Sequence, residues 1–212
     1  MAERLPRSPH PAPMELVVRP GTTIVRQGDP CPPMRVVTRG AFMVEVLRHD
    51  GRRLVLDVLG PGDGVGGPAD PIDGAPRTAQ ATTRAIGPGR VRDALVWEQV
   101  PLLARRAERA ARFAADLAWF DVPTRLVARL NVLAERFGAP APGGLAIGIR
   151  LGHDDLAALC ASSRESVSRA MRTLVAEGRV EVPRRGRIVV RRPALVQAPL
   201  PSCNRIRLHE RQ

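Results

Sequence analysis

Apolar and polar positions recur with helical spacing through residues 154–177. The segment 154–160 places apolar side chains at i, i+3 and i+4, with Asp154 and Asp155 in its first turn, where the helix dipole favours acidic residues. After a short turn at 161–162, a second helix presents its side chains at about 100° per residue. Its polar arc comprises Arg164, Glu165, Ser168, Arg169 and Arg172, and its apolar face comprises Val167, Ala170 and Leu174. The pattern predicts two short packed helices, the second of which keeps its polar face free.

A hairpin pattern follows this helix pair. Gly178 is placed to end the second helix, and residues 179–182 and 188–191 are rich in β-branched side chains. The turn between them is basic, at 184–187. Two helices followed by a β-wing predict a winged helix-turn-helix domain, whose second helix enters the major groove of DNA.

The start of the second helix resembles a known family at the level of individual residues. The run from Ser163 to Arg169 reads Ser-Arg-Glu-Ser-Val-Ser-Arg. It is similar to the Ser-Arg-Glu-Thr-Val-x-Arg run that opens the recognition helix in the family of the cyclic-AMP receptor protein and the fumarate-nitrate reduction regulator (CRP/FNR). The resemblance implies that Arg164 and Arg169 donate to guanine edges and that Glu165 accepts from a cytosine amino group, which suits these groups chemically. It also implies phosphate contacts from Ser163, Ser166 and Arg187.

Two alternatives remain for these side chains. Ser162-x-x-Glu165 is also a capping box, in which Glu165 would only satisfy backbone N–H groups. The arginines of the second helix and the wing would then form a solvated basic surface.

Short β-branched runs separated by glycine and proline turns characterise the first 60 residues. The runs are 17–18, 22–25, 34–38, 41–47 and 53–59, and a hairpin turn is expected at 49–52. Their spacing predicts an antiparallel barrel or jelly roll. Turns at Gly28-Asp29, Arg39-Gly40 and Pro61-Gly62-Asp63 resemble those of the double-stranded β-roll that the family uses as a sensor. The glycine-rich stretch 62–67 is expected to be a flexible loop, because no strand-to-helix context makes it a nucleotide fingerprint.

The effector site departs from the pattern of members that bind cyclic nucleotides. Those members hold the ribose with a Gly-Glu pair and the phosphate with an Arg-Ser or Arg-Thr pair. Here Gly66-Gly67 stands at the first pair, so the ribose-binding carboxylate is missing, while Arg77-Thr78 remains as a candidate effector-binding pair. The resemblance therefore predicts no cyclic-AMP cofactor and regulation by another effector or by none. Activation by cyclic AMP is the alternative.

The longest helical pattern covers residues 101–120, with Pro101 expected in the first turn. Its seam has the alternating spacing of four and three that marks a short coiled coil, and it comprises Leu103, Ala107, Ala110, Ala114 and Leu117. This pattern predicts a dimer interface, and the alternative is a helix that packs only on its own β-roll. Asp121 is expected to cap the next helix, 123–137.

Together these elements predict an α+β chain. The expected parts are a β-roll sensor at 14–100, a dimerisation helix at 101–120 and a winged helix-turn-helix domain at 121–192, with flexible tails at 1–13 and 193–212. The resemblance implies a homodimer on an inverted repeat in double-stranded DNA, with RNA polymerase as a further partner. A ligand-binding or protein-interaction module without DNA binding is the alternative from another class, and it leaves the basic wing unexplained.

Composition excludes several other classes. The formal net charge is +12 and every basic residue is an arginine, which partly reflects the bias of a GC-rich coding sequence. No apolar run is long enough to cross a bilayer, and residues 1–13 lack the apolar core of a signal peptide, so a cytoplasmic protein is expected. The three cysteines and four histidines are scattered, which predicts neither a metal site nor an enzyme. Cys160 is expected in the core.

Overall fold

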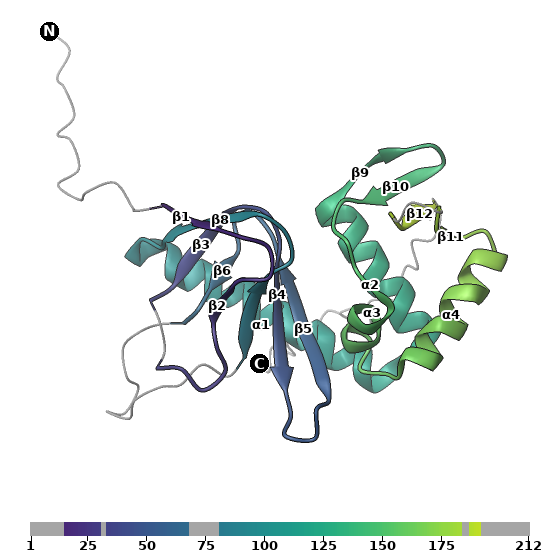
Figure 1. Ribbon diagram of the computed structural model, residues 1–212, viewed down its shortest axis with the longest axis horizontal. Coiled ribbons are helices and arrows are strands. Elements are labelled where there is room, and N and C mark those ends of the chain that lie inside the picture. Colours follow the sequence, from purple (N-terminus) through teal and green to yellow (C-terminus); the bar gives the residue numbers. More distant parts are fainter. Residues whose placement is uncertain (1–14, 31–32, 68–80, 184–186, 192–212) are drawn as a thin grey trace, which may run out of the picture.

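The computed structural model describes residues 15–30, 33–67, 81–183 and 187–191 (Figure 1). A β-roll and a mostly helical domain lie side by side, and one long helix connects them (Figure 1). The expected tails at 1–13 and 193–212 and the pair Arg77-Thr78 lie outside the described residues.

The described part of the β-roll forms two four-stranded antiparallel sheets. One sheet has the order β1 (Glu15–Val18), β8 (Gly89–Asp93), β3 (Arg35–Arg39), β6 (Gly64–Val65). The other has the order β2 (Thr23–Val25), β7 (Thr82–Ala85), β4 (Phe42–Leu47), β5 (Arg53–Leu59). Between them lies a core that includes Val37, Phe42 and Val91. The five strands expected from the β-branched runs are confirmed, whereas β6, β7 and β8 were not expected.

Helix α1 (Val96–Trp119) begins five residues before the expected start, so Pro101 lies inside it rather than in its first turn. The earlier start has a local cause. The Glu98 carboxylate accepts a hydrogen bond from the Leu95 backbone N–H at 2.8 Å and pairs with Arg92 of β8. This pairing starts the helix directly after β8. Proline has no N–H for the i−4 bond, so the helix continues through Pro101 with one bond fewer.

Among the described residues, the helical domain contains four strands as well as three helices. Its elements in chain order are α2 (Val122–Phe137), β9 (Gly138–Ala141), β10 (Gly144–Ile147), α3 (His153–Leu159), α4 (Arg164–Ala176), β11 (Val180–Glu181) and β12 (Val189–Arg191). The strands form one sheet in the order β11-β12-β10-β9. The hairpin of β11 and β12 confirms the expected wing, whereas the hairpin of β9 and β10 was not expected.

Capping residues define the ends of the helices that position the site. Asp121 accepts from the Thr124 backbone N–H at 3.0 Å, as expected for the N-cap of α2, and hydrogen bonding to Thr124 lowers the pKa of Asp121. Gly178 ends α4 with a φ of +68°, a conformation that favours glycine. The backbone N–H of Arg179 then donates to the carbonyl of Leu174 at 3.0 Å, which is the 6→1 hydrogen bond of a Schellman motif. The wing therefore leaves α4 in a defined direction.

The main apolar core crosses the boundary between the two domains. Met43, Val55 and Val58 of the β-roll belong to the same buried cluster as Leu126 of α2 and Leu156 of α3. Cys160 is fully buried in this cluster, as expected, and burial raises the pKa of its thiol to about 11. The helix-turn-helix is thus packed directly on its own β-roll.

Candidate nucleic-acid interface

The outer face of α4 carries the polar arc predicted from helical spacing. Five side chains line an open hollow along this face: Arg164, Glu165, Ser168, Arg169 and Arg172. The opposite face is buried through Val167, Ala170, Met171 and Leu174. One face therefore packs against the domain, and the other presents three guanidinium groups and one carboxylate to a partner.

The first turn of α4 differs in detail from the expected capping box. Ser163, not Ser162, is the N-cap, and its hydroxyl accepts from the Ser166 backbone N–H at 3.2 Å. Hydrogen bonds to its own backbone N–H and to Ser163 lower the pKa of Glu165. The exposed Glu165 carboxylate is therefore ionised at neutral pH and is an acceptor only, as a contact to a cytosine amino group requires.

Helix α3 supports this face at two points. The Arg164 Nε lies 3.7 Å from Asp154 Oδ1, and both side chains are largely exposed. His153 Nδ1 lies 3.1 Å from Ser168 Oγ. An exposed ion pair of this kind contributes little free energy, so Arg164 can leave Asp154 for a stronger bidentate acceptor at small cost.

The wing also carries exposed basic side chains. Arg187 is exposed at the end of the wing turn, while Arg184, Arg185 and Arg192 lie outside the described residues. Arg191 pairs with Glu181 across the hairpin at 2.7 Å. Arg187 is thus the wing residue that the structure places at the surface and that the resemblance assigns to a phosphate.

Helix α1 has one buried face and one exposed apolar face. Leu102 and Phe113 are buried against the rest of the chain. Of the five predicted seam residues, Ala107, Ala110 and Ala114 are exposed, whereas Leu103 and Leu117 are half-buried. Val96 and Val100 extend the exposed stripe toward the start of the helix, with 79% and 73% of their surface exposed. The helix therefore packs on its own β-roll and also leaves an apolar stripe uncovered.

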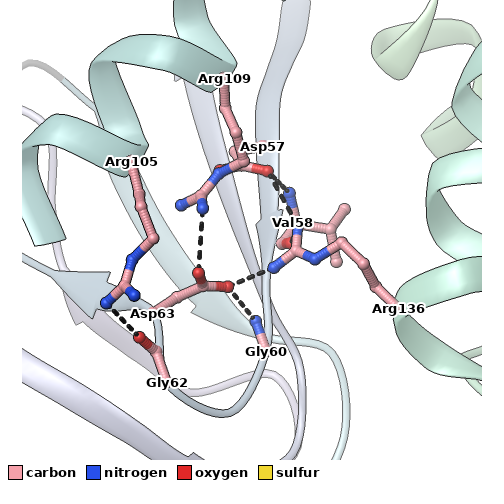
Figure 2. Close-up of polar contacts among 8 residues, drawn as sticks. All are labelled: Asp57, Val58, Gly60, Gly62, Asp63, Arg105, Arg109 and Arg136. Carbon is pink, nitrogen blue, oxygen red and sulfur yellow. Dashed lines mark hydrogen bonds and ion pairs between the residues drawn. The ribbon is translucent and has the colours of Figure 1, made fainter. Parts of the chain in front are cut away.

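The glycine-rich stretch 62–67 begins in a turn and continues into strand β6, so the expectation that it is a loop throughout is wrong. Asp63 is buried, and its Oδ2 accepts from the Gly60 backbone N–H at 2.8 Å (Figure 2). Gly62 has a φ of +87° in the same turn. Arg106 of α1 donates to the Gly66 carbonyl at 2.7 Å. A guanidinium group thus lies next to Gly66-Gly67, where the resemblance leads one to expect a Gly-Glu pair.

None of the helices in the described segments combines the length and hydropathy that a membrane span requires. In the same segments, no three His, Cys, Asp or Glu side chains group in a way that would hold a metal ion.

A β-roll joined by a long helix to a winged helix-turn-helix with an exposed basic reading face defines the class of sensor-linked DNA-binding regulators. Models of known families match both halves. Residues 15–91 match the cyclic nucleotide-binding domain, and residues 124–198 match the Crp-like helix-turn-helix domain.

Individual relatives agree with these matches. The chain is 34% identical over 165 residues to the CRP-like cAMP-activated global transcriptional regulator of Mycobacterium tuberculosis, covering 71% of this chain and 72% of the relative. It is 29% identical over 187 residues to the CRP-like protein Clp of Xanthomonas euvesicatoria, covering 80% of each chain. The chain belongs to the CRP/FNR family of transcription regulators.

Solved structures show the same fold. The c-di-GMP responsive global regulator CLP of Xanthomonas campestris superposes with a TM-score of 0.71 at 23% identity, covering 84% of this chain and 94% of that one. A CRP/FNR family regulator from Thermus thermophilus superposes with a TM-score of 0.72 at 23% identity, covering 84% and 93%. The fold class and the family are as predicted from sequence. Since the family consists of regulators, the prediction that the chain is not an enzyme is confirmed, and its helix-turn-helix implies DNA binding.

Proposed function

We propose that this chain acts as a homodimer that binds an inverted repeat in promoter DNA and regulates transcription there. The observation that carries the proposal is the free polar arc of α4, which lies on a helix otherwise buried on its opposite face. Arg164, Glu165 and Arg169 would contact base edges, and Ser163, Ser166 and Arg187 would contact phosphates. Each well-made bidentate base contact is worth about 1–3 kcal/mol of discrimination, so G·C pairs should dominate the site.

The uncovered stripe of α1 supports the homodimer. CRP-family proteins dimerise, and the small side chains of Ala107, Ala110 and Ala114 would let two such helices approach closely. A dyad between them would place two recognition helices on half-sites about 34 Å apart. The division into a sensor at 14–100, a dimerisation helix at 101–120 and a reader at 121–192 is part of this proposal.

The proposed regulation does not use cyclic AMP, or uses another effector. Gly66-Gly67 lacks the carboxylate that binds ribose, and the Arg106 guanidinium contacts the Gly66 carbonyl instead. Relatives differ in this property, since one is described as cAMP-activated and another as c-di-GMP responsive. Cyclic-AMP-dependent activation is the second candidate, and the Arg77-Thr78 pair favours it. RNA polymerase is the proposed partner at the promoter, and the cytoplasm is the proposed compartment.

Selection of bound fragments from random DNA tests the proposal. The protein should enrich an inverted repeat, and the enriched sequence and the affinity should be the same with and without cyclic AMP. Enrichment that depends on cyclic AMP would support the second candidate. Failure to retard any DNA at low salt would contradict both and would favour a module that binds only ligands or proteins.

A further inference from the structure

Strand β5 contacts the DNA-binding domain through charged side chains at two separate points. The first point is Arg53, at the start of the strand. Its guanidinium pairs with Asp155 of α3, and both side chains are about three-quarters buried, with 26% and 24% of their surface exposed. The pair joins residues 102 positions apart in the chain.

Both partners of this ion pair are fixed by further contacts. Arg53 Nε also lies 3.5 Å from Glu45 Oε2 of β4, whose side chain is only 6% exposed. Glu45 Oε1 lies 3.4 Å from Arg84 of β7. On the other side, Asp155 Oδ2 accepts from the Gly152 backbone N–H at 2.9 Å and so caps α3. The sheet thus fixes the cation, and the first turn of α3 fixes the carboxylate.

The second point lies near the end of β5 and at the turn that follows it. Arg136 of α2 donates to the Val58 carbonyl at 2.7 Å and pairs with Asp63 (Figure 2). Arg136 also lies 3.5 Å from Asp57. Arg109 of α1 pairs with both carboxylates, at 2.6 Å from Asp57 and 3.0 Å from Asp63. The side chains of Figure 2 therefore join α1, α2 and the β-roll in one network. We call the Arg53–Asp155 and Arg136–Asp63 contacts together the interdomain clasp.

The clasp leaves the reading face of α4 free. Within the described segments, the elements with substantial contacts to α4 are α2, α3 and β11, and none of them is part of the β-roll. The docked arrangement therefore does not cover Arg164, Glu165 or Arg169. The clasp is compatible with DNA binding.

We propose that Arg53 is a positioning residue that, together with Arg136, fixes the orientation of the DNA-binding domain on its own β-roll. This inference rests on the proposed function, because it concerns how a dimer presents two recognition helices to two half-sites. The half-sites demand one separation and one orientation. A domain that swings about the chain between α1 and α2 must lose that freedom when both half-sites are bound, whereas a clasped domain has already lost it.

The proposal predicts that the clasp matters for two half-sites at once and little for one. Arg53→Gln should weaken binding to the full inverted repeat by about tenfold, because the freed domain must lose its motion again when both half-sites are bound. It should weaken binding to a duplex with a single half-site by less than about twofold, because one reader needs no fixed orientation. A variant whose DNA-binding domain is merely destabilised would lose affinity for the full site and for the half-site to the same degree.

The experiment compares these variants with the wild type by fluorescence anisotropy on both duplexes. Asp155→Asn keeps an oxygen that can cap α3 but removes the ion pair, so it should match Arg53→Gln. The double variant should be no weaker than either single variant. Arg53→Lys should restore part of the full-site affinity. Arg52→Gln is the matched control, because Arg52 lies on the same hairpin with 82% of its side chain exposed.

Three outcomes would overturn the proposal: full-site affinity unchanged in both Arg53→Gln and Asp155→Asn, equal losses on both duplexes, or additive losses in the double variant. A wild-type protein that binds neither duplex above background would instead contradict the proposed function itself. The two failures are therefore distinguishable.

Discussion

The guanidinium of Arg129 lies 4.4 Å from the centroid of the Phe113 ring, so that α2 packs on α1 through a cation and an aromatic face. Arg129 also pairs with Asp116 at 3.0 Å, and both side chains are largely buried. Both charges have lost much of their hydration through burial, and this burial lowers the pKa of Arg129 and raises the pKa of Asp116. Helices α1 and α2 are thus joined by an ion pair in which each buried charge is compensated by the other.

Replacing Arg129 by methionine should destabilise the protein by about 3 kcal/mol, because it leaves the Asp116 charge uncompensated. Urea unfolding at pH 7 measures the loss. The loss should shrink as the pH falls, since the pKa of Asp116 is already raised and protonation removes the unpaired charge. Adding Asp116→Asn should recover part of the stability. A loss below about 0.5 kcal/mol would show that the contact is only a surface pair.

Replacing Arg164 by alanine should relax sequence preference at one position of each half-site. The guanidinium would be the bidentate partner of a guanine, so discrimination of about 1–3 kcal/mol should disappear there. Competition between duplexes that differ at one base pair measures this effect. An unaltered preference would contradict the assignment of Arg164 to a base.

Replacing Arg187 by alanine should weaken binding to all duplexes about equally, because a phosphate contact carries no sequence information. The magnitude of the slope of log affinity against log salt concentration should fall by about one, as expected for the loss of one phosphate contact. A titration of affinity between low and moderate salt, on a specific and a random duplex, gives both quantities. A loss confined to the specific duplex would be inconsistent with a phosphate contact.

Replacing Ala107 by glutamate should break the proposed dimer, because it puts a charge into the uncovered apolar stripe of α1. Light scattering after gel filtration should report a monomer, and affinity for the inverted repeat should fall toward that for a half-site. Arg112→Glu is the control, because Arg112 is 73% exposed and its partner Glu108 lies on the same charged side of the helix. A dimer that survives Ala107→Glu would favour the alternative in which α1 packs only on its own β-roll.

Replacing Glu98 by glutamine should remove the contribution that the ionised carboxylate makes to the free energy of unfolding, and this contribution depends on pH. The hydrogen bond from Arg92 is the main cause that lowers the pKa of Glu98 from 4.5 to about 2. A carboxyl group with a lowered pKa in the folded state stabilises the protein above its unfolded pKa, and this contribution is lost as the pH falls from about 4.5 toward 2.

At pH 7 the free energy of unfolding of the Glu98→Gln variant should be about 1 kcal/mol lower than that of the wild type. The effect is modest because the Arg92–Glu98 pair is partly solvated. The difference from wild type should narrow below about pH 4.5, the ordinary pKa of the carboxyl group. Urea unfolding at several pH values measures it, with the exposed Glu108→Gln as control. A difference that stays constant with pH would rule out the ionic origin of the contribution.

Local periodicity carried most of what was correctly predicted from sequence. The two faces of α4 and the cap at Asp121 depend on residues that lie within one or two helical turns of each other. The β-branched runs of the β-roll likewise hold their signal within a few residues. Such patterns are readable without a partner, because helix and strand geometry alone place their side chains.

Other features were missed because their signal is not local. Strands β6, β7 and β8 are short or carry arginine and threonine, and their pairing comes from strands distant in the chain. The hairpin of β9 and β10 contains a proline that argues against a strand, although the Pro142-Gly143 turn and the β-branched end of β10 could have indicated it. Pro101 suggested a helix start, but the Arg92–Glu98 pair began the helix earlier.

The sequence by itself determined which helix faces are polar or apolar, because those side chains recur along the chain at fixed intervals. It also carried the family resemblance, which lies in the contiguous run from Ser163 to Arg169. Only the tertiary structure decided that Arg53 pairs with Asp155 and that Arg136 pairs with Asp63, so that ion pairs join the β-roll to the helical domain. An ion pair between two residues far apart in the chain produces no repeating pattern in the sequence from which it could be predicted. The pairing follows from how the two domains pack, not from the neighbours of either residue.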